Sequence, residues 1–324
     1  MRLAWTIGLG AALCSVAVQA ETLPVAGVYA AGTDAPSRAR SIAIGDFSGR
    51  GGERLAFAID SALRGAVIDG EPWFALTFTA PAFGDSYTYD GGTGSRAPGR
   101  DGGPDAVMRG IAEVTWRDVD SGTKEVEECV ARANGQCTER KKVTYPCRAR
   151  EVTLRPEVRL VARGGELLYA KGDTRVLGSR FCKDEERTPA VDSMVEELAR
   201  GFAGDVRHDL APEFRAEDIR VLETREGVAK PDHNAFKAAI RLTKSDVAGA
   251  CRAFSALEAA NPSAVSLVFN IGLCREGEGD LASAEAHYRE VLALKPGKIE
   301  AVQGLERIVS RRRAETQRDL RAGR

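Results

Sequence analysis

The sequence has few of the side chains on which catalysis most often depends. It contains only three histidines, and none of them belongs to a recognisable Ser-His-Asp or Cys-His arrangement. No C-x-x-C motif occurs, and the histidines lie apart from the cysteine-rich segment, so the usual spacing of a zinc site is lacking. We therefore expect no catalytic residues, no bound metal, no cofactor and no enzyme activity.

The chain also lacks an excess of charge of either sign. Lysine and arginine number 46 against 47 acidic residues, which gives a formal net charge of -1. A surface that binds nucleic acid normally shows a clear basic excess, so we expect no nucleic acid among the partners. The length of 324 residues allows two domains, and the hydrophobic fraction of 43% suits a globular protein.

Long hydrophobic runs are lacking outside the N-terminus. There Arg2 precedes an apolar stretch over residues 3–18, and Val18-Gln19-Ala20 has small residues at its first and last positions. This pattern predicts a secretory signal peptide over residues 1–20, which is too short for a membrane span. We expect a mature chain that begins at Glu21 and is soluble in the bacterial periplasm.

A lipid anchor is not expected. Bacterial lipoproteins keep a lipid-modified Cys after such an apolar run, and Cys14 is a candidate for this position. However, Leu13 occupies the position at which lipoprotein processing needs a small residue. Peripheral association with the outer membrane stays open, and the sequence does not predict an oligomeric state.

Between residues 40 and 227 the apolar pattern alternates between the periods of strands and helices. It predicts an α/β domain of the α+β type with a mixed sheet. Strands are expected over residues 41–47, 73–79, 105–118, 152–161, 167–177 and 218–224, and helices over residues 53–68 and 188–211. Outside these elements we expect a linker or lightly ordered arm at 21–39 and a polar extended excursion at 120–142. Residues 80–104 are expected to form a mobile surface loop, with a binding lid as the alternative.

A glycine-rich turn, Gly45 to Glu53, joins the first strand to the first helix. A helix N-terminus can bind phosphate through its free N–H groups, so a nucleotide-binding protein or an enzyme is one alternative. The glycines do not fit G-x-G-x-x-G, and no Lys-Ser/Thr follows as in a P-loop. An ordinary strand–helix connection is the favoured interpretation.

The strongest signal is an internal repeat near the C-terminus. Six positions recur after 34 residues: Asp246, Val247, Ala250, Phe254, Leu257 and Pro262 match Asp280, Leu281, Ala284, Tyr288, Val291 and Pro296. Fixed self-similarity at this period predicts stacked helical hairpins. We expect residues 232–322 to form two hairpins and one capping helix.

This pattern resembles the tetratricopeptide repeat. In that family an aliphatic and a small residue on the first helix precede the Ala–aromatic–Pro set; Ile271 and Gly272 hold those places in the second repeat, and Lys237 and Ala238 in the first. The resemblance implies a protein-binding groove lined by the first helices, here by Phe236, Ala239, Phe269, Asn270 and Leu273. The alternative is that the repeats merely pack on the α/β domain. The groove lacks a paired Lys/Arg set for a peptide's C-terminal carboxylate, so a hydrophobic or polar segment is the expected ligand.

The α/β domain carries a second resemblance. Its Ile-Ala-Ile-Gly-Asp-Phe run (42–47), Asp-Ala-Val-Met-Arg-Gly run (105–110) and Val-Arg-Leu-Val hairpin (158–161) resemble the curli-secretion assembly family and the outer-membrane activators of penicillin-binding proteins. The resemblance implies an envelope protein. We expect a non-catalytic periplasmic adaptor or scaffold that binds other envelope proteins or peptides through both domains. The alternative is a regulator of a peptidoglycan synthase or part of an export assembly.

Six cysteines follow the signal peptide: Cys129, Cys137, Cys147, Cys182, Cys251 and Cys274. An even number in an exported chain predicts disulfides. The pair Cys251–Cys274 is expected because the repeat places its members on adjacent helices.

The other four cysteines are assigned from the hairpin. A two-residue turn at Gly164-Gly165 would pair Arg163 with Glu166. In a regular antiparallel hairpin the numbers of all facing residues have the same sum, here 329. Cys147 and Cys182 also sum to 329, so they would face each other. This register places the two cysteines at a hydrogen-bonded site, where opposing Cα atoms lie farther apart, and a bulge would shift it. Cys129 is left for Cys137. The connectivities 129–147 with 137–182 and 129–182 with 137–147 remain open.

Overall fold

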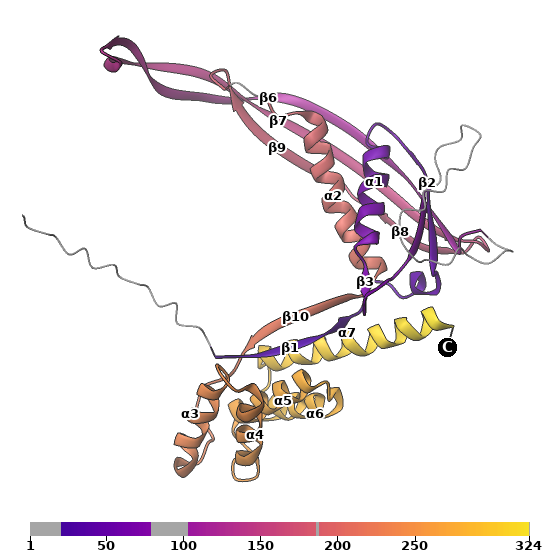
Figure 1. Cartoon of the computed structure of the whole chain (residues 1–324), viewed down its shortest axis with the longest axis vertical. Coiled ribbons are helices and arrows are strands. Elements are labelled where there is room, and N and C mark those ends of the chain that lie inside the picture. The colour runs from indigo at the N-terminus through magenta and orange to yellow at the C-terminus, as the bar shows by residue number, and fades with distance from the viewer. Residues whose placement is uncertain (1–20, 79–102, 186–187, 324) are drawn as a thin grey trace, which may run out of the picture. The chain divides into compact units, whose positions relative to one another are not determined.

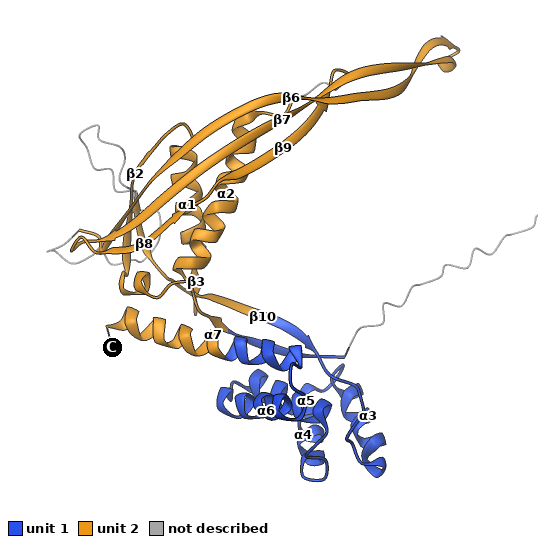
Figure 2. Ribbon diagram, turned by 180° about the vertical axis from the view of Figure 1, so that it is seen from behind, with its two compact units in different colours: residues 1–27, 216–308 blue, residues 28–215, 309–324 orange. Residues whose placement is uncertain are grey.

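The computed structural model describes residues 21–78, 103–185 and 188–323 (Figure 1). These residues divide into two compact units (Figure 2). The helical unit comprises the chain up to Gly27 together with Ala216–Ile308, and the α/β unit comprises Val28–Arg215 together with Val309–Arg324. An α/β domain followed by helices is therefore observed, as predicted, although each unit is assembled from separate stretches of chain.

The α/β unit contains one mixed sheet with strand order β5-β2-β6-β7-β8, and β9 also pairs with β7. The two pairings of β2 are parallel and those of β7 are antiparallel. The strands are β2 Ser41–Ser48, β5 Ala75–Phe78, β6 Ala106–Ala133, β7 Gln136–Ala162, β8 Leu167–Gly172 and β9 Arg175–Cys182. Two short strands, β3 Val67–Ile68 and β4 Glu71–Pro72, pair separately.

Helices α1, Gly52–Arg64, and α2, Val191–Leu210, pack side by side on this sheet (Figure 1). The period-2 pattern of β7 explains the burial, since every even-numbered residue from Val152 to Leu160 is buried while the odd-numbered residues between them are not. The aliphatic residues among them share one core with the apolar side of α2, which includes Phe202. The loop predicted at 80–104 falls almost entirely outside the described residues.

The polar extended excursion predicted at 120–142 is the outer part of two long paired strands. Residues 106–162 form one long hairpin, in which β6 and β7 pair from Ala106↔Ala162 to Ala133↔Gln136. At its end Asn134 and Gly135 both have positive φ, 51° and 78°, as a type I′ turn requires. Asn-Gly is the strongest short hairpin signal, so the sequence did contain the information. Figure 1 shows the two strands running on as a twisted ribbon past β9.

The predicted linker at 21–39 is wrong. Strand β1, Thr22–Tyr29, pairs with β10, Glu213–Arg220, and a 3-10 turn follows at Ala35–Arg38. Leu23 and Val25 are buried in the helical unit because their alternation with exposed residues gives the strand one apolar side. Composition rich in Ala, Gly, Pro and Thr concealed this alternation.

The helical unit contains the expected hairpins: α3 His233–Leu242 with α4 Val247–Glu258, and α5 Val265–Glu278 with α6 Leu281–Leu294. A short 3-10 turn, Lys230–Asp232, precedes α3. The repeated aspartates are N-caps, since the side chains of Asp246 and Asp280 accept hydrogen bonds from Gly249 N (2.7 Å) and Ser283 N (3.0 Å). Such caps satisfy backbone donors that would otherwise have no partner at the helix start.

The first helices do not follow the 34-residue register. Ring pairs Phe236–Phe254 and Phe269–Tyr288 lie 6.0 and 5.6 Å apart between centroids, so α5 matches α3 at 269 − 236 = 33 residues, whereas α6 matches α4 at 288 − 254 = 34. Ala239 therefore corresponds to Gly272, and it is fully buried while Ala238 is exposed. The assignment of Ala238 and Lys237 to the small and aliphatic places was one residue out of register.

The last helix, α7 Ile299–Ala322, contributes to both units, and the division falls after Ile308. Its later part is not the polar cap that was predicted. Within the α/β unit, the buried side chain of Gln317 accepts a hydrogen bond from Ala31 N (2.9 Å) and donates one to Asp34 Oδ1 (2.7 Å), while Arg321 lies over the Trp73 ring.

Candidate functional site

All five residues predicted to line the groove are buried: Phe236, Ala239, Phe269, Asn270 and Leu273. The chain itself fills the side of the helices on which they lie. Leu23, Val25 and Val221 belong to the same core cluster as these helices. In this structure none of the five is available to a ligand.

Asn270 shows how the chain is held there. Its side-chain oxygen accepts a hydrogen bond from Leu222 N (2.8 Å), and its side-chain nitrogen donates one to Leu222 O (2.9 Å). Both partners are main-chain groups, so the contact does not depend on the side chain at that position. A fully buried amide thus binds a backbone segment that enters from a distant part of the sequence.

A second set of contacts fixes the neighbouring segment. Glu21 O accepts a hydrogen bond from Val221 N (3.0 Å), and the Glu21 carboxylate pairs with Lys244 Nζ at 3.0 Å. The hydrogen bond from Lys244 lowers the pKa of Glu21 below its ordinary value. The N-terminal strand is thereby tied to the turn that follows α3.

The open surface of the unit lies on α3. Two hollows meet there, one of about 620 Å³ and one of about 170 Å³. Lys237 and Arg241 line both hollows and are exposed, and we refer to these two residues as the α3 ledge. The larger hollow is completed by Asn234, Ala238, Leu242 and Ser245, and the smaller by Glu21, Glu223, Arg225, Phe236 and Ile240.

The ledge has an excess of positive charge. Within the described part of the chain, Lys237, Arg241 and Arg225 make no ion pair. The two acidic residues at the smaller hollow are already engaged, since Glu223 pairs with Arg220 (3.2 Å) and Glu21 with Lys244. The predicted repeat register did not indicate the ledge, because it placed Lys237 at an aliphatic core position, one residue out of register. The available signal was a Lys and an Arg four residues apart on an amphipathic helix.

The structure contains the three predicted disulfides, Cys129–Cys137, Cys147–Cys182 and Cys251–Cys274. The strand register at the second one is as expected, with Cys147 opposite Cys182. The route to it differs. The turn spans Arg163 to Gly165, because Ala162 N donates a hydrogen bond to Glu166 O. An unmatched residue in β8, Leu168, then restores the sum of 329.

The hydrogen-bonded site predicted for the Cys147–Cys182 pair is corrected as well. Lys183 N donates to Pro146 O (3.1 Å), so the hydrogen-bonded position is the adjacent one. The two cysteines occupy a non-hydrogen-bonded site, and their Cα atoms lie 4.0 Å apart.

The glycine-rich turn offers little to a phosphate. Gly51 N donates to Ala112 O (2.9 Å) and Gly52 N to Gly49 O (3.0 Å), so two of the amides that could cradle an anion are already engaged. A Cβ on Gly52 would lie 2.4 Å from Phe47 O. Close packing of backbone against backbone therefore accounts for this glycine.

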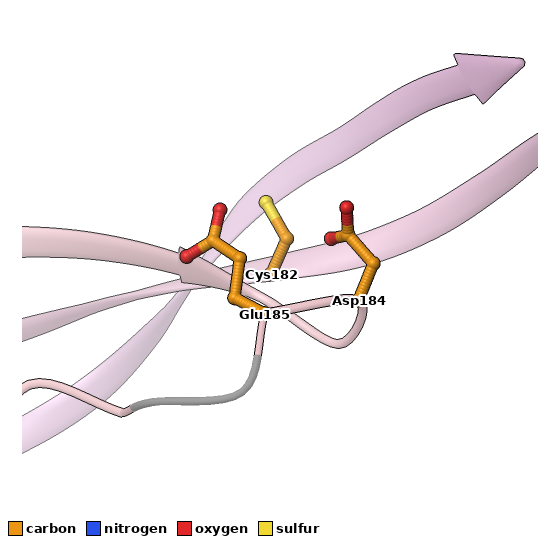
Figure 3. A group of neighbouring side chains, drawn as sticks. All are labelled: Cys182, Asp184 and Glu185. Atoms are coloured by element: carbon orange, nitrogen blue, oxygen red, sulfur yellow. The ribbon is translucent and has the colours of Figure 1, made fainter.

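One group of side chains has the spacing of metal ligands: Cys182, Asp184 and Glu185 (Figure 3). The Cys182 sulfur is bonded to Cys147, so it is no thiolate. Lys124 Nζ lies 2.9 Å from Asp184 and 3.4 Å from Glu185. The arrangement is a disulfide beside an ion pair and does not fit a metal ion.

No helix in the described part of the chain combines the length and the apolarity that crossing a membrane requires. No protein-family model matches the sequence, and the comparison with curated proteins gives no significant match. Among solved structures, the crystal structure of a protein described as a neuraminyllactose-binding hemagglutinin homolog from Helicobacter pylori aligns over 54% of this chain and 82% of that chain. Its identity is 10% and its TM-score 0.25. This likeness is too low to carry an argument about fold or function.

Proposed function

We propose that the protein is a non-catalytic adaptor of the bacterial envelope whose helical unit binds polypeptide segments of other proteins. The observation that carries the proposal is the contact between Asn270 and Leu222, in which the unit already holds a stretch of its own main chain just after β10. The tetratricopeptide-like repeat and the three disulfides support the same interpretation, since disulfides persist in oxidising compartments such as the periplasm.

The site of binding moves from the predicted groove to the α3 ledge and its two hollows. The groove positions are occupied by the chain, whereas the ledge is exposed and lies against residues 223–225, where the bound internal segment leaves Asn270. A partner segment at the ledge would continue along the same helices. The glycine-rich turn is no part of this proposal, because the amides of Gly51 and Gly52 are engaged within the fold.

Filling the larger hollow tests the proposal. Ala238 is exposed and lines this hollow, so Ala238→Trp would occupy it without entering the core. Ala282, exposed on α6, provides the matched control Ala282→Trp. The mature chain and both variants are immobilised and used to capture proteins from envelope extracts, and the captured proteins are quantified by mass spectrometry. We expect a specific set of proteins that Ala238→Trp loses and Ala282→Trp retains. Capture of the same proteins by all three chains, or of none, would refute the proposal.

A further inference from the structure

We propose that the α3 ledge binds an acidic, extended segment of a partner polypeptide, with Lys237 and Arg241 pairing to carboxylates. This inference rests on the proposed function and adds the chemistry of the partner. Charge, shape and the neighbouring segment of main chain each support it.

The charges form a compact acceptor for anions. Lys237 and Arg241 are four residues apart on α3, so their side chains project from the same side of the helix. Arg225 adds a third positive charge at the smaller hollow. Glu21 and Glu223 pair with Arg and Lys residues outside the ledge, and no acid in the described part of the chain makes an ion pair with Lys237 or Arg241.

The shape favours an extended chain over a compact ligand. Lys237 and Arg241 border both hollows. A segment that crosses these two residues therefore has a hollow on either side of it. Successive side chains of an extended segment point in opposite directions, which brings every second residue toward the cations. The buried Phe236 and Ile240 form an apolar floor in the smaller hollow, where an intervening aliphatic part can pack.

The neighbouring internal segment, which follows β10, shows that main chain can be held against this part of the unit. Leu222 is held in place by Asn270, and Glu223, the next residue, already lines the smaller hollow. A nucleic acid is disfavoured, since three exposed cations are a short track for a phosphate backbone and the chain's net charge is -1. A partner protein with spaced Asp or Glu residues fits better.

The test uses the mature full-length chain and defined peptides in fluorescence anisotropy titrations. The probe is a fluorescein-labelled, C-terminally amidated peptide of alternating Glu and Ser, about ten residues long. Alternating Gln/Ser and Lys/Ser peptides are the comparison probes, and a Gln/Ser peptide with a free C-terminal carboxylate separates side-chain from terminal carboxylates. The charge-reversal variant is Lys237→Glu/Arg241→Glu. Its matched control, Arg252→Glu/Lys295→Glu, reverses two exposed cations elsewhere on the same unit.

We expect the Glu/Ser peptide to bind at least about fivefold tighter than the amidated Gln/Ser peptide, and to weaken as salt rises, as exposed ion pairs do. Reversal at the ledge should remove this preference, whereas Lys237→Arg/Arg241→Lys and the matched control should keep it. Equal binding of acidic and neutral peptides would overturn the inference, as would tight binding confined to the free-carboxylate peptide. If that happens while Ala238→Trp still abolishes capture, the charge argument fails and the proposed function stands.

Discussion

The buried carboxylate of Glu276 gives the sharpest test of how the helical unit is held together. Its side chain is 0% exposed, yet it carries a charge partner on α7. Oε1 accepts from Arg307 Nε (2.8 Å) and Oε2 from Arg307 Nη2 (2.7 Å), while the Tyr288 hydroxyl donates to Oε2 at 2.6 Å. The bidentate ion pair joins α5 to α7, and the tyrosine hydrogen bond links α6 to the same carboxylate.

Removing one partner should cost far more than removing both. Arg307→Leu leaves a buried carboxylate without its charge partner, for which about 3–5 kcal/mol is the usual loss. Tyr288→Phe keeps the ring but removes a hydrogen bond to a charged group, worth about 1.5–3 kcal/mol. In Glu276→Leu/Arg307→Leu no charge stays buried, so the double variant should be more stable than Arg307→Leu alone.

The assay is urea unfolding of the mature chain followed by circular dichroism at the helix band. Arg289→Leu is the control, since Arg289 is an exposed cation whose loss should stay within about 0.5 kcal/mol. The reasoning is refuted if the free energy of unfolding lost by Arg307→Leu is no larger than that lost by the control. It is refuted equally if the double variant loses the sum of the two single losses.

Three further predictions concern the α/β unit. Gln317→Ala removes buried hydrogen bonds to Ala31 and should lower the free energy of unfolding of this unit by about 1–3 kcal/mol. Unfolding is followed by tryptophan fluorescence, which includes that of Trp73. The control is Gln303→Ala, at an exposed position on the same helix. Burial alone would raise the pKa of Asp209, but hydrogen bonds from Lys171 and Tyr169 outweigh it and hold that pKa below its ordinary value. A lowered folded-state pKa adds stability that is present above the unfolded value and is lost as the pH falls through the folded one, so the advantage of the wild type over Asp209→Asn should shrink as the pH falls below about 4, the ordinary pKa of an aspartate. The Cys129–Cys137 disulfide, with Cys137 exposed, should be reduced before the two buried disulfides, as differential alkylation would show.

Each of the three has a contradicting result. Equal stability of the two glutamine variants would mean that the later part of α7 is not anchored. An unchanged gap between wild type and Asp209→Asn over this fall in pH would remove the proton-linked role of Asp209. Simultaneous reduction of all three disulfides would argue against selective access at the hairpin tip.

The sequence predicted the repeat well where the interactions are local. Asp246 and Asp280 cap their own helices, and Ala250, Phe254, Ala284 and Tyr288 face the partner helix of the same hairpin or the next one. Such contacts depend on spacing along one short stretch, which the 34-residue period reports directly. The Cys147–Cys182 pair was predicted correctly although the assumed turn is wrong, because the longer turn and the bulge that follows it compensate each other.

The groove was mispredicted because its occupant comes from elsewhere in the chain. Nothing in the pattern of α3 and α5 indicates that Leu222 will bind Asn270 or that Leu23 and Val25 will be buried among these helices. The shift from 34 to 33 residues on the first helices was equally hidden, since several alanines in α3 fit either register. The α3 ledge depends on the exposure of Lys237 and Arg241, which the repeat pattern does not report.

Site-specific photo-crosslinking tests the central claim most directly, namely that a partner protein binds at the α3 ledge. A photoreactive phenylalanine derivative replaces Asn234, which lines the larger hollow, or Glu290, which is exposed on α6 away from it. The protein is irradiated in cells that export it. Our account predicts a protein adduct from position 234 that is lost with Lys237→Glu/Arg241→Glu and absent from position 290. Equal adducts at both positions, or none at position 234, would contradict it.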